Sequence, residues 1–365
     1  MSGDPLAEGS PRYDIAIVGA GMAGASLGAA LAAQARVLVI EAEDRPGYHA
    51  TGRSAAFWTE SYGGPGVQPL TTASGPFLRE GGFLSERGAL TIARRGRENA
   101  LADFAATYRD LGVRVDELDR AALLARIPGL RDAWTRGAFE PACADIDVSA
   151  LHHHYLSQLR GAVRCRAALT QALRRASGWD LTLANGATVQ AAILVNAAGA
   201  WADTVAQLAG VGPIGIAPYR RTVAQVRTAP APPADLPLVL DLDETFYFKP
   251  EAGRLWLSPH DETPSAALDA APEEIDVALA IDRFEGVADW RIEAVEHKWA
   301  GLRSFAPDRL PVYGFDRAEP AFFWFAGQGG FGIQTAPAAA DLAARLVVGR
   351  APGVVDPAPY APTRF

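Results

Sequence analysis

The stretch YDIAIVGAGMAGASLGAALAAQARVLVIE, residues 13–41, decides the fold. It begins with an apolar run typical of a buried strand and continues into three glycines with the spacing GxGxxG. Small residues continue to position 35, and a second apolar run, residues 37–40, leads to Glu41. This order predicts a strand, a tight turn, a helix and a second strand, which together form a dinucleotide-binding unit.

Each glycine of this unit has a physical role. Gly19 permits the tight turn, Gly21 lets the backbone approach a pyrophosphate at the helix N-terminus, and Gly24 lets the helix and the strand pack closely. Glu41 is placed to accept hydrogen bonds from a ribose, and its negative charge would repel a 2′-phosphate. The stretch therefore predicts a dinucleotide that lacks this phosphate.

Length and composition narrow the class of protein. The chain has 365 residues, of which 49% are hydrophobic and 21% charged, enough for two cores or one core with large insertions. The net charge of −8 argues against a partner that is a nucleic acid. Cys143 and Cys165 are the only cysteines, so a disulfide scaffold is not indicated and a cytoplasmic setting is expected.

Two segments near the N-terminus have to be compared with a membrane span and with a signal peptide. Residues 15–35 carry no charge and could span a bilayer by length, but their four glycines favour a strand, turn and helix in a soluble protein. Residues 1–10 lack the basic flank and apolar run of a signal peptide and are expected to form a frayed tail. No transmembrane segment is predicted.

The rest of the chain predicts a second kind of architecture. Three short β-rich runs between turn signals, residues 223–226, 246–249 and 255–258, indicate one antiparallel sheet. Helical patterns cover residues 100–111 and 336–348, and a further helix is expected over residues 149–160. The predicted fold class is therefore α/β: a Rossmann-like domain with an inserted α+β domain built on an antiparallel sheet.

Two further segments have the composition of ligand-binding turns. An apolar run ends in small residues over positions 191–201, which would let the backbone pass close to a flat group, although plain core packing is the alternative. Residues 327–335, GQGGFGIQT, precede an alanine-rich helix, for which Thr335 is the expected N-cap. Glycine amides near a helix N-terminus can stabilise negative charge.

The three motifs, in this order, resemble the D-amino-acid oxidase superfamily of FAD-dependent oxidoreductases. Within it, the chain is most similar to the bacterial D-arginine dehydrogenases. Six blocks carry the likeness: residues 46–62 (PGYHATGRSAAFWTESY), 144–151 (ADIDVSAL), 194–201 (LVNAAGAW), 242–250 (LDETFYFKP), 299–305 (WAGLRSF) and 328–335 (QGGFGIQT).

The resemblance implies two discontinuous domains. The FAD-binding domain is expected to comprise residues 1–64, 143–215 and 300–365, and the substrate-binding domain residues 65–142 and 216–299. It also implies that residues 50–57 wrap the flavin and that residues 329–334 hold the pyrimidine end of its ring. The implied cofactor-binding residues are Gly19, Gly21, Ala23, Gly24, Glu41, Ala42, Ala50, Thr51, Gly52, Arg53, Ser54, Ala55, Ala56, Phe57, Leu169, Gly199, Gly329, Gly330, Phe331, Gly332, Ile333 and Gln334.

The resemblance further assigns a substrate site. A carboxylate-binding set is implied that consists of Arg221, Tyr247 and Arg303 with the backbone of Gly330. Tyr62 is expected to close over the substrate from a mobile loop. A guanidinium can bind a carboxylate with two parallel hydrogen bonds, which fits these roles. Arg220 precedes Arg221, so the assignment is ambiguous by one position.

Two departures from the D-arginine dehydrogenases bear on specificity. Phe57 stands where they have a histidine, and Ala89 stands where they have the glutamate that pairs with a cationic substrate side chain. The loss of this acid favours neutral, apolar or aromatic D-amino acids. Glu60 or Glu86 is a possible replacement for it.

The electron acceptor and the flavin linkage can also be predicted. Trp256 aligns with the lysine that assists oxygen in the sarcosine-oxidase branch, so a dehydrogenase is favoured, with a quinone, another carrier or O2 as acceptor. Lys249 shares a strand face with Tyr247 and is an alternative partner of the flavin. Neither cysteine lies where that branch attaches flavin, and His49 resembles an attachment residue of dimethylglycine-type enzymes. We expect non-covalent FAD.

The resulting hypothesis is oxidative deamination of free D-amino acids, in which hydride leaves Cα and the imino acid is hydrolysed to a 2-oxo acid and ammonia. The main alternative is an oxidase of N-methyl or cyclic amino acids, of the sarcosine or proline type. An NAD-dependent dehydrogenase and a flavoprotein without turnover are weaker rivals. A monomer or homodimer is expected.

The histidines are not expected to bind metal. His152, His153 and His154 occupy consecutive helix positions about 100° apart, so they cannot converge on one ion. His260 and His297 have no partner at a metal-ligand spacing. We interpret all of them as ordinary, partly solvated residues.

Overall fold

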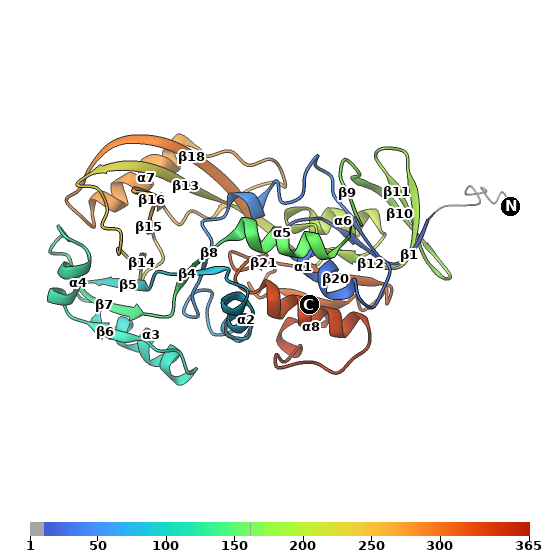
Figure 1. Cartoon of the computed structure of the whole chain (residues 1–365), viewed down its shortest axis with the longest axis horizontal. Helices are drawn as coiled ribbons and strands as arrows, with labels where there is room; N and C mark the ends of the chain where they lie inside the picture. The colour runs from blue at the N-terminus through green and yellow to red at the C-terminus, as the bar shows by residue number, and fades with distance from the viewer. Residues whose placement is uncertain (1–10, 161) are drawn as a thin grey trace. The chain divides into compact units, whose positions relative to one another are not determined.

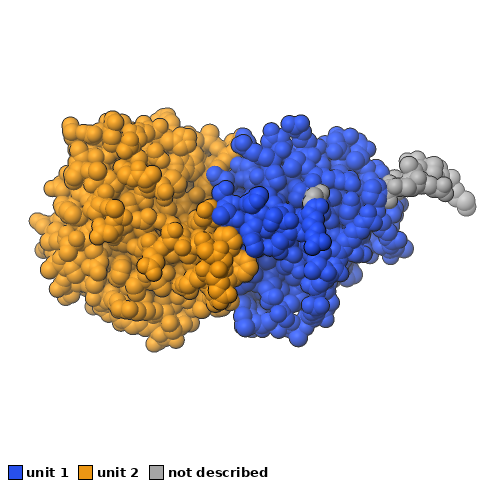
Figure 2. All heavy atoms as spheres, in the orientation of Figure 1, with its two compact units in different colours: residues 1–52, 148–218, 303–365 blue, residues 53–147, 219–302 orange. Residues whose placement is uncertain are grey.

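The computed structural model describes residues 11–160 and 162–365, so the expected tail lies outside the described residues. Contacts between Cα atoms divide the chain into two compact units, coloured separately in Figure 2. Unit 1 comprises the described residues of Met1–Gly52, Val148–Pro218 and Arg303–Phe365. Unit 2 comprises Arg53–Asp147 and Tyr219–Leu302.

Unit 1 is built on a mixed sheet in which β1 lies between β12 and β2; Figure 1 labels β1 and β12. β1 (Arg12–Val18) runs parallel to β2 (Val37–Ile40) on one side and to β12 (Thr188–Asn196) on the other. The strand order is β10-β11-β12-β1-β2-β9, and β20 pairs with β12 and β19. The other strands are β9 (Val163–Arg164), β10 (Leu169–Arg175), β11 (Gly178–Leu183), β19 (Val312–Phe315) and β20 (Phe322–Ala326).

Helices pack on this sheet because small residues allow close approach. In α1 (Met22–Leu31) a Cβ added at Gly24 would lie 1.8 Å from the carbonyl oxygen of Gly19. The helix ends at Leu31, four residues before the expected position 35, and turns lead from there to β2.

The remaining elements of the unit are α5 (Val148–Gln158), η2 (Gly199–Trp201), α6 (Ala202–Leu208), β21 (Gln328–Gly329), α8 (Ala336–Val347), η3 (Ala358–Tyr360) and η4 (Pro362–Arg364).

Unit 2 contains the predicted sheet, which is largely antiparallel, although β14 runs parallel to β5. Its strands follow the order β18-β13-β16-β15-β14-β5-β7-β6, and β17 pairs with β13. The three predicted runs are confirmed in β13, β15 and β16, although β15 begins at Tyr247, one residue later than predicted. Ala224 pairs with Leu257, and Lys249 with Trp256. The strands are β5 (Ala89–Arg94), β6 (Asp116–Leu118), β7 (Trp134–Glu140), β13 (Ala217–Ala229), β14 (Leu238–Asp241), β15 (Tyr247–Glu251), β16 (Arg254–Ser258), β17 (Thr263–Pro264) and β18 (Arg291–Phe305).

A small second sheet explains where the units divide. β3 (Phe57–Trp58) and β4 (Leu84–Glu86) both pair with β8 (Ala144–Ile146). This pairing draws residues 53–64 and 143–147 into unit 2, whereas the sequence had assigned them to the FAD-binding domain. The helices of unit 2 are α2 (Gln68–Glu80), α3 (Glu98–Asp110), α4 (Arg120–Arg126) and α7 (Glu274–Glu285), and η1 (Ala50–Arg53) contains the first boundary.

The apolar stretch at residues 15–35 is divided between β1, the glycine turn and α1. None of the helices in the described part of the chain is long and apolar enough to cross a membrane.

Candidate functional site

The glycine turn of unit 1 has the conformation that its sequence requires. Gly19 has φ +103°, in a region that L side chains rarely adopt, and a Cβ there would lie 2.5 Å from the carbonyl oxygen of Ala197. The small residues that follow β12 therefore pass directly against this turn. This contact gives the segment after β12 a packing role, in addition to any contact with a ligand.

Glu41 closes the turn from the end of β2. Its Oε2 accepts a hydrogen bond of 2.8 Å from the amide of Ala20, and its Oε1 accepts one of 3.0 Å from the amide of Glu43. The residue is buried. The carboxylate therefore lies at the carboxyl edge of the sheet, which is where dinucleotides bind in folds of this type.

The N-terminus of α1 fits a pyrophosphate. Its N-cap residue is Gly21, which offers no side chain to cap the first amides. Thr51 Oγ1 accepts a hydrogen bond of 2.9 Å from the amide of Met22, so this hydroxyl borders the helix end. Exposed amides and the positive end of a helix favour an anion, and Gly21 adds no side chain that would block its approach.

His152 supports the same turn from α5. Its Nε2 lies 3.0 Å from the carbonyl oxygen of Ala20, and a Cβ on Gly47 would meet its ring at 2.8 Å. Burial lowers the pKa of His152 below its usual value of 6.5, while the contact with Ala20 and the charge of Glu41 oppose this effect. The helix pattern predicts a partly solvated His152, but the residue is buried.

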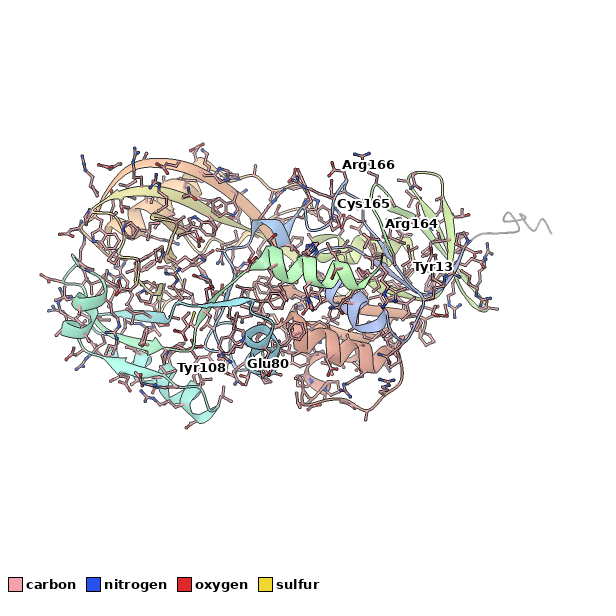
Figure 3. The ribbon with its side chains drawn as sticks, viewed as in Figure 1. Tyr13, Glu80, Tyr108, Arg164, Cys165 and Arg166 are labelled. Atoms are coloured by element: carbon pink, nitrogen blue, oxygen red, sulfur yellow. The ribbon has the colours of Figure 1, made fainter. Side chains whose placement is uncertain are left out.

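Arg164 is the last residue of β9, the strand that pairs with β2. Figure 3 labels it together with Tyr13 and Cys165. Arg164 donates a hydrogen bond of 3.1 Å to the hydroxyl of Tyr13, and its guanidinium lies over that ring. Cys165 follows directly, and burial raises the pKa of its thiol. A thiol held protonated is a weak nucleophile.

The glycine-rich segment before α8 contains two of the predicted residues. A Cβ on Gly330 would lie 2.8 Å from Arg303 Nη1, so the guanidinium lies against this backbone. Thr335 does occupy the N-cap position, but its hydroxyl makes no capping hydrogen bond. It donates instead to the carbonyl oxygen of Phe331 at 2.9 Å, four residues earlier, so the predicted N-cap position is confirmed but the hydroxyl does not cap the helix.

In unit 2, an aromatic cluster gathers around Tyr62. The ring of Phe57 lies 5.2 Å from that of Tyr62 and 6.0 Å from that of Tyr247, both edge to face. His260 completes the cluster, because its Nε2 lies 3.3 Å from the Tyr62 hydroxyl and its ring is 5.9 Å from that of Tyr247. His260 belongs to no recognisable motif, so the sequence predicts only an ordinary, partly solvated residue at this position.

Arg221 and Arg220 differ in their surroundings. Arg220 lies against two carboxylates and donates to Asp276 at 2.9 Å and to Glu273. Arg221 is buried and donates from Nε to the carbonyl oxygen of Asp261 at 2.9 Å. Among the described residues, its buried Nη2 has no hydrogen-bond partner; an oxygen of Glu262 lies 3.7 Å away. A buried guanidinium nitrogen without an acceptor is suited to an anionic ligand.

Ala89 lies in apolar surroundings. It belongs to a buried cluster, and the partly buried Tyr62, Leu240 and Trp256 pack against this cluster. The other buried members are Ala55, Phe57, Cys143, Leu238 and Tyr247. Such surroundings suit an uncharged group better than a cation.

The two acidic residues that were candidates to replace the missing glutamate lie in other surroundings than Ala89. Glu60 accepts a hydrogen bond from the hydroxyl of Thr72 in α2. Glu86 is exposed on β4. Neither belongs to the apolar cluster around Ala89.

Glu140 holds the segment that leads to Tyr62. Its carboxylate accepts hydrogen bonds from the Thr59 hydroxyl at 2.6 Å, from the amides of Glu60 and Ser61 at 2.8 and 3.1 Å, and from the Ser61 hydroxyl at 2.5 Å. Burial raises the pKa of Glu140, and these four hydrogen bonds oppose the rise. The sequence offered no signal for this long-range anchor.

Lys249 and Arg53 have partners within unit 2. Lys249 is buried, and its Nζ lies 2.7 Å from Asp145, 3.2 Å from Glu251 and 5.2 Å from the ring centre of Trp256. Arg53, which was predicted to contact the cofactor, donates to the carbonyl oxygens of Ala270 and Ala300 at 2.8 and 3.3 Å. Its guanidinium is thus engaged by the protein.

The structure thus assembles the predicted residues in two sets. Tyr62, Arg221 and Tyr247 belong to unit 2, while Arg303 and Gly330 belong to unit 1. Among the described residues, no group of three or more histidine, cysteine or acidic side chains could hold a metal ion.

The nucleotide-binding sheet and its glycine turn define a dinucleotide-binding protein of the Rossmann type. Residues 14–346 match the family model described as FAD dependent oxidoreductase, and the chain belongs to this family. FAD is therefore its cofactor, and the turn, Glu41 and the N-terminus of α1 are the features that fit it.

Individual proteins show how far the likeness extends. The chain is 37% identical over 105 residues to a glycine oxidase of Pseudomonas aeruginosa, and this match covers 29% of this chain and 27% of that protein. It is 25% identical over 177 residues to FAD-dependent oxidoreductase domain-containing protein 1 of Xenopus laevis, covering 44% of this chain and 36% of the relative. The chain thus covers less than half of these curated relatives.

A solved structure matches over nearly the whole length. The glycine oxidase from Geobacillus kaustophilus has a TM-score of 0.84 and 25% sequence identity, and the match covers 98% of this chain and 100% of the other. The α/β fold with one mixed and one largely antiparallel sheet is therefore that of known FAD enzymes.

Proposed function

We propose that the protein oxidises the Cα–N bond of free D-amino acids with neutral, apolar or aromatic side chains. The observation that carries this proposal is the buried Arg221, whose Nη2 has no hydrogen-bond partner among the described residues of unit 2. A substrate carboxylate would supply the acceptor. The six sequence blocks that resemble those of the D-arginine dehydrogenases support the D configuration.

The proposed roles follow from the chemistry of each side chain. In unit 2, Arg221 and Tyr247 bind the substrate carboxylate, and Tyr62 covers the substrate. In unit 1, Arg303 and the backbone of Gly330 contribute to carboxylate binding. Fixing the carboxylate orients the Cα–H bond, and orientation of this kind supplies much of the rate in bimolecular chemistry.

The cofactor supplies the redox chemistry: FAD, when bound, takes up two electrons and the hydrogen from Cα. The amino acid becomes an imino acid, which water hydrolyses to a 2-oxo acid and ammonia. If the amine binds in its neutral form, no protein base is required. The amine ionisation then governs the pH dependence of kcat/KM.

The side-chain preference rests on Ala89. The residue lies in an apolar cluster with Phe57 and Tyr247, where the burial of an unpaired guanidinium or ammonium would be strongly unfavourable. A neutral side chain gains free energy from the same contacts, about 25 cal/mol for each Å² of apolar surface removed from water.

Two finer features of the proposal concern the flavin. We propose that FAD is bound without a covalent link and that the enzyme is a dehydrogenase with a quinone or another carrier as acceptor. The ion pairs of Lys249 with Asp145 and Glu251 support the second point, since they engage the only lysine near Tyr247 in the sequence.

The test is the visible spectrum of the purified protein without oxygen, before and after addition of a pool of neutral D-amino acids or the matching L-amino acids. We expect flavin bands that only the D pool bleaches. Slow return of colour in air would identify a dehydrogenase, and fast return an oxidase. Bleaching by the L pool alone would overturn the assigned configuration.

The likeness to two glycine oxidases favours a second candidate. An oxidase of small, N-methyl or cyclic amino acids has the same fold and the same need for a carboxylate-binding arginine. Bleaching by sarcosine or proline, with no response to either pool, would establish this alternative.

A further inference from the structure

His260 lies in a short turn between β16 and β17 with an unusual backbone conformation. Its φ is +51°, in the left-handed region that residues other than glycine seldom adopt. Such conformations persist where the surroundings determine them, and they cluster at functional sites.

The surroundings do determine this turn. The amide of His260 donates to Ser258 Oγ at 3.2 Å, and Arg283 donates to the carbonyl oxygen of Pro259. On the other side, the Asp261 carboxylate accepts hydrogen bonds from the amide and the hydroxyl of Thr222 at 2.8 and 3.0 Å. Since Thr222 follows Arg221 in β13, the same turn holds the strand that presents the proposed carboxylate-binding arginine.

The imidazole is directed at the proposed substrate residues of unit 2. Its Nε2 lies 3.3 Å from the Tyr62 hydroxyl, within hydrogen-bond reach. Its ring stands edge to face with both Tyr62, at 6.1 Å, and Tyr247, at 5.9 Å. Glu140 binds the backbone amides just before Tyr62, and His260 contacts the Tyr62 hydroxyl. Different residues therefore hold the backbone of this segment and the side chain of Tyr62.

We propose that His260 is a positioning residue for Tyr62, and that this function raises the affinity for the amino-acid carboxylate. In the proposed state, Nε2–H of His260 donates to the Tyr62 oxygen. The hydroxyl proton of Tyr62 then cannot point at the imidazole, and the phenol ring is held in the aromatic cluster. This inference rests on the proposed function, because it assigns Tyr62 to the substrate site.

Two contributions of His260 have to be separated: the hydrogen bond and the ring contacts. Gln places an N–H donor near the position of Nε2 but lacks the ring. Phe keeps an edge-to-face ring but lacks the donor. If the hydrogen bond is what matters, His260→Gln restores function and His260→Phe does not.

The experiment measures the anaerobic rate of flavin reduction against amino-acid concentration, which yields an apparent Kd and a limiting rate. We expect His260→Phe to raise the Kd about fivefold to tenfold, because one hydrogen bond is lost, and to change the limiting rate less than about twofold. His260→Gln should restore most of the affinity. In a Tyr62→Phe background, His260→Phe should have no further effect, since its partner is already gone.

The matched control is His297→Phe. His297 lies on β18, where its ring stacks on that of Trp299 at 5.3 Å and not on those of Tyr62 or Tyr247, so this variant should retain the wild-type Kd. A wild-type Kd in His260→Phe, or an equal loss of affinity in the Tyr62→Phe background, would overturn the inference. So would a loss of affinity in His260→Gln as large as that in His260→Phe.

A second ligand keeps this inference distinct from the proposed function. Benzoate has a carboxylate but no Cα–H bond, and its binding can be followed by perturbation of the flavin spectrum. If no amino acid reduces the flavin, the proposed reaction is wrong, and the benzoate Kd in the same variants then decides the role of His260. If the wild-type protein binds neither amino acids nor benzoate, both proposals fail.

Discussion

Ala89 and Glu140 are paired directly across β5 and β7, so their side chains project from the same face of the sheet. The position where an acid is missing is thus opposite a buried acid whose carboxylate binds residues 59–61. We expect Ala89→Glu to raise kcat/KM for D-arginine, relative to that for a neutral D-amino acid, by about tenfold or more, because a charge-assisted hydrogen bond becomes available.

Ala89→Gln is the control, since it has a similar size without the charge. It should leave the preference for neutral substrates in place. Ala89→Glu should also lower the Tm, because two buried carboxylates on one face of the sheet repel each other. An unchanged ratio of the two kcat/KM values in Ala89→Glu would place the substrate side chain elsewhere.

Glu140→Gln tests the anchor of the Tyr62 segment. Gln has one oxygen and cannot accept all four hydrogen bonds, so buried donors lose their partners. We expect the free energy of unfolding to fall by about 2–4 kcal/mol and the KM for amino acids to rise severalfold. Urea unfolding and steady-state kinetics would measure the two effects.

The matched variant Glu86→Gln changes an exposed carboxylate on β4 and should leave both quantities within about 0.5 kcal/mol of the wild-type values. A less stable Glu140→Gln with the KM of the wild type would show that the anchor has no connection with substrate binding.

Arg221 and Arg220 can be distinguished by one substitution each. Arg221→Lys removes the fork that would bind a carboxylate, and we expect its KM to rise about a hundredfold or more. Arg220→Lys alters a guanidinium that donates to Asp276 and Glu273, so it should mainly affect thermal stability. The reverse pattern of KM values would move the assignment to Arg220.

Gly24→Ala should abolish FAD binding. The new Cβ would lie 1.8 Å from the carbonyl oxygen of Gly19, so the glycine turn and α1 would have to move apart. The ratio of flavin to protein after purification measures the effect. Gly212→Ala is the control, because nothing lies within 4 Å of its Cβ and its φ is not in the positive region. Full flavin content in Gly24→Ala would contradict the close packing of this unit.

The lowered pKa of His152 predicts that the free energy of unfolding depends on pH. Its pKa is lowered in the folded state, chiefly by burial, so the unfolded chain binds the proton at a higher pH than the folded chain does. The free energy of unfolding therefore falls as the pH decreases from about 6.5 towards the folded-state pKa. His152→Gln should reduce the difference between urea midpoints at about pH 7.5 and about pH 5.5. His153→Gln, at an exposed position of the same helix, should leave that difference unchanged.

The sequence was sufficient for elements whose signal is local. The glycine spacing and flanking apolar runs predicted β1, α1 and β2, and the alternation of turn residues with β-branched residues predicted the antiparallel strands. The end of α1 was predicted too late, because small residues such as Ala32 and Ala35 favour a helix and give no stop signal.

Features that depend on distant pairings could not be predicted. The extent of unit 2 depends on the pairing of Phe57 with Asp145, and the anchor of the Tyr62 segment depends on Glu140, about 80 residues away in the chain. His260 and His152 are single residues in unremarkable stretches. Their surroundings become visible only when the tertiary structure brings those stretches to Tyr62 and to the glycine turn.

The alternation of the chain between the two units has a consequence for biosynthesis. β20 (Phe322–Ala326) pairs with β12 in unit 1, yet it is synthesised after Leu302, the last residue of unit 2. On the ribosome, unit 2 can therefore be complete while the end of β12 still lacks its parallel neighbour β20. The nascent nucleotide-binding unit then presents an open sheet edge and apolar surface, which makes it the part of the chain most in need of a chaperone.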